Sequence, residues 1–92
     1  MEIANQETVL LDFYSDTCAP CKTLMRDLED LIKEFSNLTI QKCNIMENWD
    51  LTEEYKITSV PTLIILKNQM MVNRYTGYKG KEDLKKFLTE NT

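Results

Sequence analysis

Runs of apolar residues predict four β-strands along the chain. The first run, Thr8–Tyr14, is almost continuously apolar, which is typical of a strand buried on both faces. Residues 38–45 and 62–66 form the second and third runs, and residues 71–75 form the fourth. The Asn68-Gln69 pair separates the last two runs and predicts a two-residue turn between antiparallel strands.

Three other segments are predicted to be helices, the first and last of them from amphipathic spacing. The first begins near Cys18–Cys21 and ends near Ser36-Asn37, and its apolar face comprises Leu24, Leu28, Leu31, Ile32 and Phe35. Asp50 and Glu53 predict a capping box for a short helix that ends near Tyr55. The final helix follows Gly80, and its apolar face comprises Leu84, Phe87 and Leu88.

The predicted order of elements is therefore βαβαββα, which indicates an α/β fold. A strand–helix–strand unit at the front implies a parallel pair, and the closing hairpin adds an antiparallel one. The sheet should be mixed, with helices on both faces. The chain has no internal repeat and no linker rich in Pro, Gly or Ser, so we expect residues 1–92 to form a single domain.

The charge balance disfavours two classes of partner. The 92 residues include 11 Lys and Arg and 15 Asp and Glu, which gives a net charge of −4. We therefore expect no binding to nucleic acid or to anionic membranes through bulk charge. No signal peptide and no apolar run of membrane-spanning length is visible, so we expect a cytoplasmic protein with reduced thiols.

The chain contains no histidine. This excludes Ser-His-Asp and Cys-His catalysis and zinc sites that need imidazole ligands. Any acid–base chemistry must come from carboxylates, Lys, Cys or Tyr.

The segment Cys18-Ala19-Pro20-Cys21-Lys22 lies between a predicted buried strand and a predicted helix. At this spacing the two sulfurs can form a disulfide with little backbone movement. The amino end of the helix favours a thiolate on Cys18, and Cys21, one turn further in, is the natural resolving thiol. Zinc binding is disfavoured because only Cys43, itself predicted to be a core residue, and carboxylates would complete four ligands. We expect no metal site.

Several motifs together resemble the thioredoxin family. They are Asp12-Phe13-Tyr14, the Cys18–Lys22 segment and Val60-Pro61-Thr62, and the resemblance extends from about Val9 to Leu88. It implies that Cys18 attacks a disulfide in a target protein and forms a mixed disulfide, which Cys21 then resolves. It also implies disulfide-containing protein substrates, a flavoprotein thioredoxin reductase as electron donor, no bound cofactor and a monomer.

The resemblance also assigns residues to proton transfer and to substrate contact. Asp12 matches the family's buried carboxylate, and burial should raise its pKa. Lys42 matches the lysine that accompanies this carboxylate. Pro61 matches the family's cis-proline, and Val60 would pair its backbone with the substrate chain. The implied substrate-contact surface comprises Thr17, Ala19, Pro20, Val60, Pro61 and Gly77.

The chain departs from the family pattern in places. Thr17 replaces an aromatic residue and Ala19 replaces a glycine, which affects partner choice and redox potential. Only 17 residues precede Cys18, so the leading strand and helix should be mostly absent. We expect a thioredoxin-like sheet of four strands in the order 2-1-3-4, with Glu2–Ala4 as a vestigial edge strand.

Two other functions remain possible from the sequence: a docking module with dispensable thiols, and a thiol metal carrier. Trp49 is expected to be a packing residue remote from the cysteines, and Met70-Met71 is expected to pack in the hairpin.

Overall fold

The computed structural model describes residues 2–92. Its elements follow the order β1 (Thr8–Tyr14), α1 (Ala19–Leu31), η1 (Ile32–Glu34, a 3-10 turn), β2 (Leu38–Asn44), α2 (Trp49–Glu54), β3 (Thr62–Lys67), β4 (Met70–Thr76) and α3 (Lys81–Asn91). The predicted βαβαββα order is confirmed. Among residues 2–92, no helix has the length and apolar character needed to cross a membrane.

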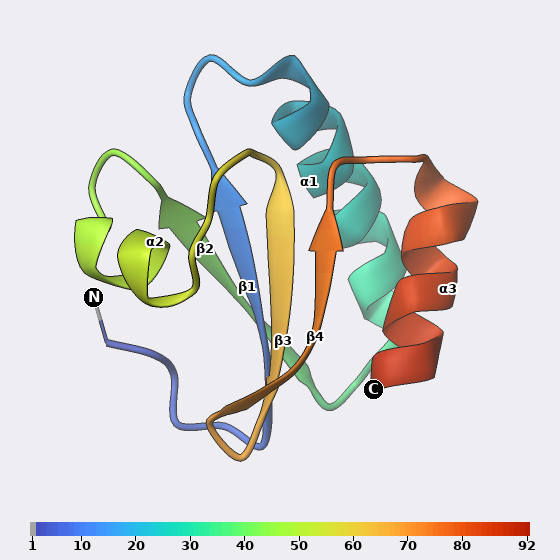
Figure 1. The fold of residues 1–92 in the computed structure, drawn as a ribbon. Helices are drawn as coiled ribbons and strands as arrows, with labels where there is room; N and C mark the ends of the chain where they lie inside the picture. Colours follow the sequence, from blue (N-terminus) through green and yellow to red (C-terminus); the bar gives the residue numbers. More distant parts are fainter. Residues whose placement is uncertain (1) are drawn as a thin grey trace.

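The four strands form one mixed sheet in the order β2-β1-β3-β4, as predicted (Figure 1). β1 runs parallel to β2 and antiparallel to β3, and β3 pairs with β4 in a hairpin. The segments after β1, after β2, before β3 and after β4 therefore all lie at one end of the sheet. We call this the cysteine end, because Cys18 lies in the loop from β1 to α1 and Cys21 lies in the first turn of α1.

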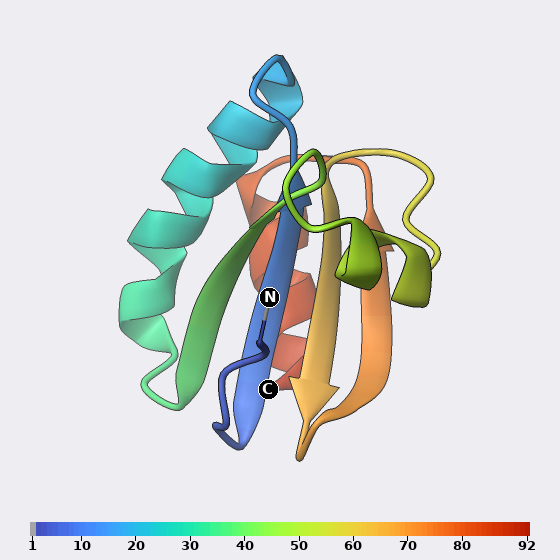
Figure 2. The ribbon, with the colours of Figure 1, turned by 90° about the vertical axis from the view of Figure 1, so that its left-hand side faces the viewer.

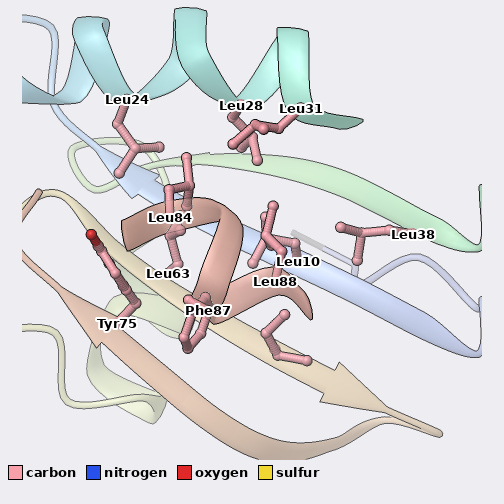
Figure 3. Packing of buried hydrophobic residues seen from close by; sticks show 11 residues of the cluster. Leu10, Leu24, Leu28, Leu31, Leu38, Leu63, Tyr75, Leu84, Phe87 and Leu88 are labelled. Atoms are coloured by element: carbon pink, nitrogen blue, oxygen red, sulfur yellow. The ribbon is translucent and has the colours of Figure 1, made fainter. Parts of the chain in front are cut away.

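Helices cover both faces of the sheet, with α1 and α3 on one face and α2 on the other (Figures 1 and 2). Leucines and aromatic residues from β1, β3, β4, α1 and α3 fill the first interface (Figure 3). The second interface is smaller and buries Val9, Leu11, Phe13, Cys43, Leu51, Ile64 and Leu66. Alternate residues of β1 thus face opposite clusters, as in a strand buried on both sides.

The turn between β3 and β4 has the predicted two-residue form. Asn68 and Gln69 have φ angles of 50° and 72°, so both occupy the left-handed region. A type I′ hairpin turn requires this conformation at both central positions. Lys67 and Met70 pair directly across the turn.

α1 ends earlier than the apolar spacing predicts. Its α-helical hydrogen bonding stops at Leu31, and η1 tightens the chain over one further turn. Phe35 then leaves the helical region, with φ −127° and ψ 81°, while its side chain packs against the α1/α3 cluster. The apolar spacing therefore continues into the turn, although the helix does not.

The predicted capping box of α2 is wrong. α2 begins at Trp49, so Asn48 occupies the N-cap position and Asp50 lies within the first turn. The side chain of Asn48 does not cap the helix, because its Nδ2 donates to the carbonyl of Asn44 at 3.0 Å.

Glu2–Ala4 does not form the predicted edge strand. The side-chain amide of Gln41 on β2 holds this segment instead, since it accepts from Ala4 N at 2.8 Å and donates to Glu2 O at 2.7 Å. Ile3 and Ala4 pack against the cluster beneath α2. The segment thus covers apolar surface without joining the sheet.

Two predicted packing sites are exposed instead. Trp49 is 63% exposed, because α2 buries only Leu51 of its residues. Met70 and Met71 are 72% and 49% exposed, since they lie on the edge strand β4, where Tyr75 is the one buried residue.

Candidate active site

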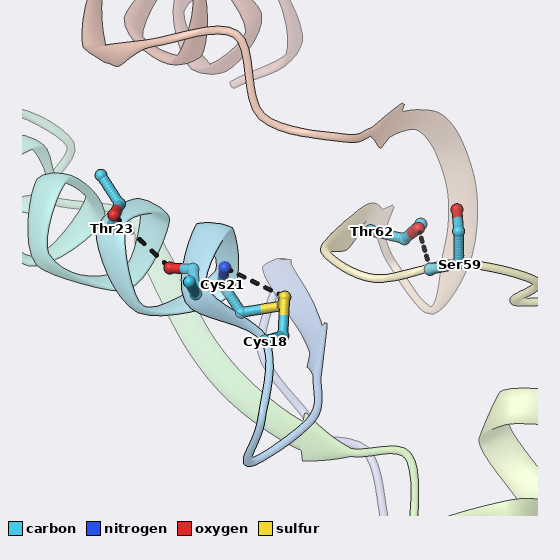
Figure 4. Close-up of a disulfide and its surroundings, with 6 residues drawn as sticks. Cys18, Cys21, Thr23, Ser59 and Thr62 are labelled. Carbon is cyan, nitrogen blue, oxygen red and sulfur yellow. Dashed lines mark hydrogen bonds between the residues drawn. A yellow bond between two sulfur atoms is a disulfide. The ribbon is translucent and has the colours of Figure 1, made fainter.

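Cys18 and Cys21 form a disulfide at the start of α1 (Figure 4). Their Cα atoms are 5.2 Å apart, within the range that disulfides require. Cys18 is half-buried and occupies the N-cap position with extended backbone angles, whereas Cys21 lies inside the helix and is buried. One sulfur of the pair is therefore near solvent and the other is shielded.

The first turn of α1 directs backbone N–H groups towards Cys18. Cys21 N donates to Cys18 Sγ at 3.1 Å, as Figure 4 shows. Pro20 lies in the same turn, where its missing N–H removes no helical hydrogen bond. After reduction, the donor and the helix dipole would favour a thiolate at Cys18.

The loop before β3 lies at the same end of the sheet. The peptide bond between Val60 and Pro61 is cis, as expected. Thr62 Oγ1 donates to Ser59 O at 2.8 Å (Figure 4), and Gly77 N donates to Pro61 O at 2.9 Å. Gly77 has φ +79°, which favours glycine there. These bonds fix the loop and the end of β4 to each other.

The structure brings the predicted contact residues to the cysteine end from three segments. Thr17, Ala19 and Pro20 are exposed around Cys18. Val60 is half-buried and Pro61 is buried in the facing loop. Gly77 joins them through its hydrogen bond to Pro61.

Asp12 is fully buried on the α1/α3 face of the sheet, two residues after Leu10 on the same face. Neither of its carboxylate oxygens has a hydrogen-bonding partner within residues 2–92. Burial raises the pKa of Asp12 to about 7, and the positive charge of Lys42 partly opposes this rise. A carboxyl group with this pKa can both accept and release a proton near neutral pH.

Lys42 is the neighbour of Asp12 on β2, in register across the parallel pair. Its side chain is half-exposed, and its Nζ lies 3.9 Å from Oε1 of Glu29 on α1. Both side chains line a cleft of about 390 Å³ that also reaches Cys21 and Arg26. Sequence reasoning missed Glu29, whose only signal is its place on the polar face of the first helix.

Cys43 is confirmed as a core residue. It is fully buried in the cluster beneath α2, and burial raises the pKa of its thiol to about 11. Within residues 2–92, no group of three or more His, Cys, Asp or Glu side chains is arranged to hold a metal ion.

Known proteins resemble the chain in sequence and in structure. The family model described as thioredoxin matches residues 1–90. A thioredoxin from Chlamydia pneumoniae is 41% identical over 83 residues, which span 90% of this chain and 81% of that protein. Among solved structures, a mutant thioredoxin from Halobacterium salinarum gives a TM-score of 0.83 at 31% identity. The match covers 95% of this chain and 76% of that protein. Fasciola hepatica thioredoxin gives 0.85 at 25% identity, with coverage of 96% and 85%.

Proposed function

The chain belongs to the thioredoxin family and is a dithiol–disulfide oxidoreductase, and we propose how its residues divide that reaction. In the reduced protein, the Cys18 thiolate attacks one sulfur of a disulfide in a target protein. A mixed disulfide forms between Cys18 and the target, and the other target sulfur leaves as a thiolate. The half-buried position of Cys18 and the N–H donor beside its sulfur support this role.

Cys21 completes the exchange. Its thiol loses a proton, and the thiolate attacks Cys18 Sγ, which releases the second target sulfur and restores the Cys18–Cys21 disulfide. Two electrons pass to the target, and no bound cofactor takes part. Burial of Cys21 supports the assignment, because it keeps this thiol from attacking a target first.

Asp12 is the proposed acceptor of the proton that Cys21 loses. Asp12 is buried on the face of the sheet that α1 covers, and Cys21 is a buried residue of α1. The pKa of Asp12, raised to about 7 by burial, suits a group that exchanges protons near neutral pH. Lys42 is a positioning residue, whose charge limits the rise in that pKa.

Val60, Pro61 and Gly77 form the proposed contact surface for the target, together with Thr17, Ala19 and Pro20. Their common place at the cysteine end and the bond from Gly77 to Pro61 support this surface. Disulfide-bearing proteins and a thioredoxin reductase are typical partners of the family. We extend this to a flavoprotein reductase that donates electrons to the disulfide, and to a single-domain monomer.

The observation that carries the proposal is the disulfide between a half-buried cysteine at the helix start and a buried one within the helix. The test is the reduction of insulin by dithiothreitol, followed by the turbidity of the released chains. Cys18→Ser should lower the catalysed rate to the uncatalysed background. Cys43→Ser is the matched control and should retain turnover within about twofold of the unmodified protein.

Turnover by Cys18→Ser equal to that of the unmodified protein would contradict the assignment and favour a docking module. Stoichiometric zinc in the purified protein would favour a metal carrier instead. Among residues 2–92, no cluster of His, Cys, Asp or Glu side chains supports the metal carrier.

A further inference from the structure

Five large apolar side chains among residues 2–92 are markedly exposed, and they fall into two groups. Met70, Met71 and Val72 lie on β4 beside the hairpin turn, at the end of the sheet opposite the cysteines (Figure 1). Met46 and Trp49, each 63% exposed, follow β2 and so emerge at the cysteine end. We refer to these two residues as the Met46–Trp49 pair.

The strand register joins the Met46–Trp49 pair to the loop that carries Cys18. Tyr14 and Asn44, the last residues of β1 and β2, pair in parallel register. Ile45 N donates to Tyr14 O at 3.0 Å, which continues the pairing one residue beyond β2. The loops that lead to the Met46–Trp49 pair and to Cys18 therefore leave the sheet side by side.

Side-chain hydrogen bonds then fix one loop against the other. Asn44 is buried, and its Nδ2 donates to Asp16 Oδ1, two residues before Cys18, at 3.2 Å. Its Oδ1 accepts from Met46 N at 3.0 Å. The carbonyl of Asn44 accepts from both the backbone and the side chain of Asn48, the residue before Trp49. These hydrogen bonds fix the backbone at Met46 and beside Trp49.

The surroundings of this pair indicate the chemistry of its partner. Thr17, Ala19 and Pro20 are exposed around Cys18, and none of them has a large side chain. Trp and Met, in contrast, are enriched at protein interfaces, where Trp often anchors binding. Glu47 and Glu53 are exposed close by in the sequence, so basic residues on a partner would be attracted to the same region.

We propose that the Met46–Trp49 pair extends the surface that binds disulfide-bearing protein substrates, and that it takes an apolar side chain flanked by basic residues on the substrate chain. The surface is continuous with the disulfide through Asn44 and Asp16. The inference rests on the proposed function, because the substrate must first engage Cys18. It adds specificity for proteins over small disulfides, since a small disulfide at Cys18 does not extend to a second loop.

The first test uses the fluorescence of Trp49, the sole tryptophan of the chain. The Cys21→Ser variant would be linked through Cys18 to scrambled ribonuclease A, a basic disulfide-bearing protein that lacks tryptophan. Acrylamide quenching of Trp49 should fall by about twofold relative to the same variant linked to β-mercaptoethanol, because the protein covers the indole. Equal quenching in the two adducts would overturn the proposed surface. Failure to form any adduct at Cys18 would overturn the proposed function, and the surface with it.

The second test compares kinetics on two substrates. Trp49→Ser and Met46→Ser should each raise the KM for scrambled ribonuclease A by about fivefold and leave the reduction of dithiobis(nitrobenzoate), a small disulfide, unchanged. Met70→Ser is the matched control, since Met70 is also largely exposed, at 72%, but lies at the opposite end of the sheet. Trp49→Phe should restore most of the lost affinity. The same KM for Trp49→Ser and Met70→Ser would contradict the proposal.

Discussion

Asp12 and Cys43 are buried titratable groups on opposite faces of the sheet, and burial gives them different properties. Asp12 lies on the face covered by α1 and α3, and Cys43 lies on the face covered by α2. Burial is the main cause of the pKa shift in both cases. It raises the pKa of Asp12 from 3.8 to about 7, and that of Cys43 from 9.0 to about 11.

The difference between the two groups comes from their ordinary pKa values, 3.8 for Asp12 and 9.0 for Cys43. Desolvation penalises the charged form, so it raises the pKa of any buried acid. For a carboxyl group this movement leads towards neutral pH and makes proton exchange possible. For a thiol it leads away from neutral pH, so Cys43 remains protonated and unreactive. The same physical cause thus produces a proposed proton acceptor on one face and a packing residue on the other.

The largest expected effect on stability comes from Asp12→Asn. The folded state holds the Asp12 proton more tightly than the unfolded state, so the stability that this proton contributes is complete below pH 3.8 and is lost as the pH rises through about 7. The full loss amounts to about 4 kcal/mol in the free energy of unfolding. Asp12→Asn cannot ionise and should not show this loss, as urea unfolding of the oxidised protein from pH 4 to pH 8 would measure.

Cys43→Ala is the control on the opposite face. Its stability profile should run parallel to that of the unmodified protein over the same pH range, because the Cys43 thiol does not titrate there. If Asp12→Asn also ran parallel to the unmodified protein, the comparison between the faces would fail.

The next prediction compares packing on the two faces. Leu28 is fully buried between the sheet, α1 and α3, whereas Leu51 is the one buried residue of the short helix α2. Leu28→Ala should lower the free energy of unfolding by about 4 kcal/mol and Leu51→Ala by about 2 kcal/mol, since a cavity enclosed on all sides collapses less. Denaturant unfolding would measure both changes. A larger loss for Leu51→Ala would show that the face beneath α2 contributes more than its smaller cluster indicates.

The smallest expected effect is that of Lys42→Met. Removing this positive charge should raise the pKa of Asp12 further, because the charge of Lys42 lowers it in the folded protein. The pH at which the loss of stability is complete should then rise by less than about one unit. The shift is small because Lys42 is half-exposed and solvent screens its charge. Lys33→Met is the matched control, because Lys33 is also exposed on the surface and pairs with Asp30 instead. An identical shift in both variants would indicate a general charge effect.

The sequence pattern predicted those parts of the fold that depend on neighbouring residues. The apolar run in β1 has the predicted bounds, Thr8–Tyr14, because a strand buried on both faces leaves an uninterrupted signal. The turn at Asn68-Gln69 was also predictable from neighbouring residues, because this pair separates two apolar runs. The strand order and the cis bond before Pro61 followed from the family resemblance, and both are confirmed.

The remaining features depend on contacts between segments that lie far apart in the sequence. The predicted capping box at Asp50 is wrong because α2 starts two residues earlier, with Asn48 at the N-cap position, and the Asn48 side chain bonds to Asn44. The exposure of Trp49 and Met70 could not be predicted, since apolar character does not show which surfaces a helix will cover. The approach of Glu29 to Lys42 joins α1 to β2 and has no local signal.

The central claim is that burial makes Asp12 a proton-exchanging group near neutral pH and keeps Cys43 protonated. A ¹³C NMR titration of the oxidised protein, with both side-chain carbons assigned, tests this directly. We predict a midpoint of about 7 for the Asp12 carboxyl carbon and no titration of Cys43 below pH 9. A midpoint near 4 for Asp12, or a titration of Cys43 in the neutral range, would contradict the account.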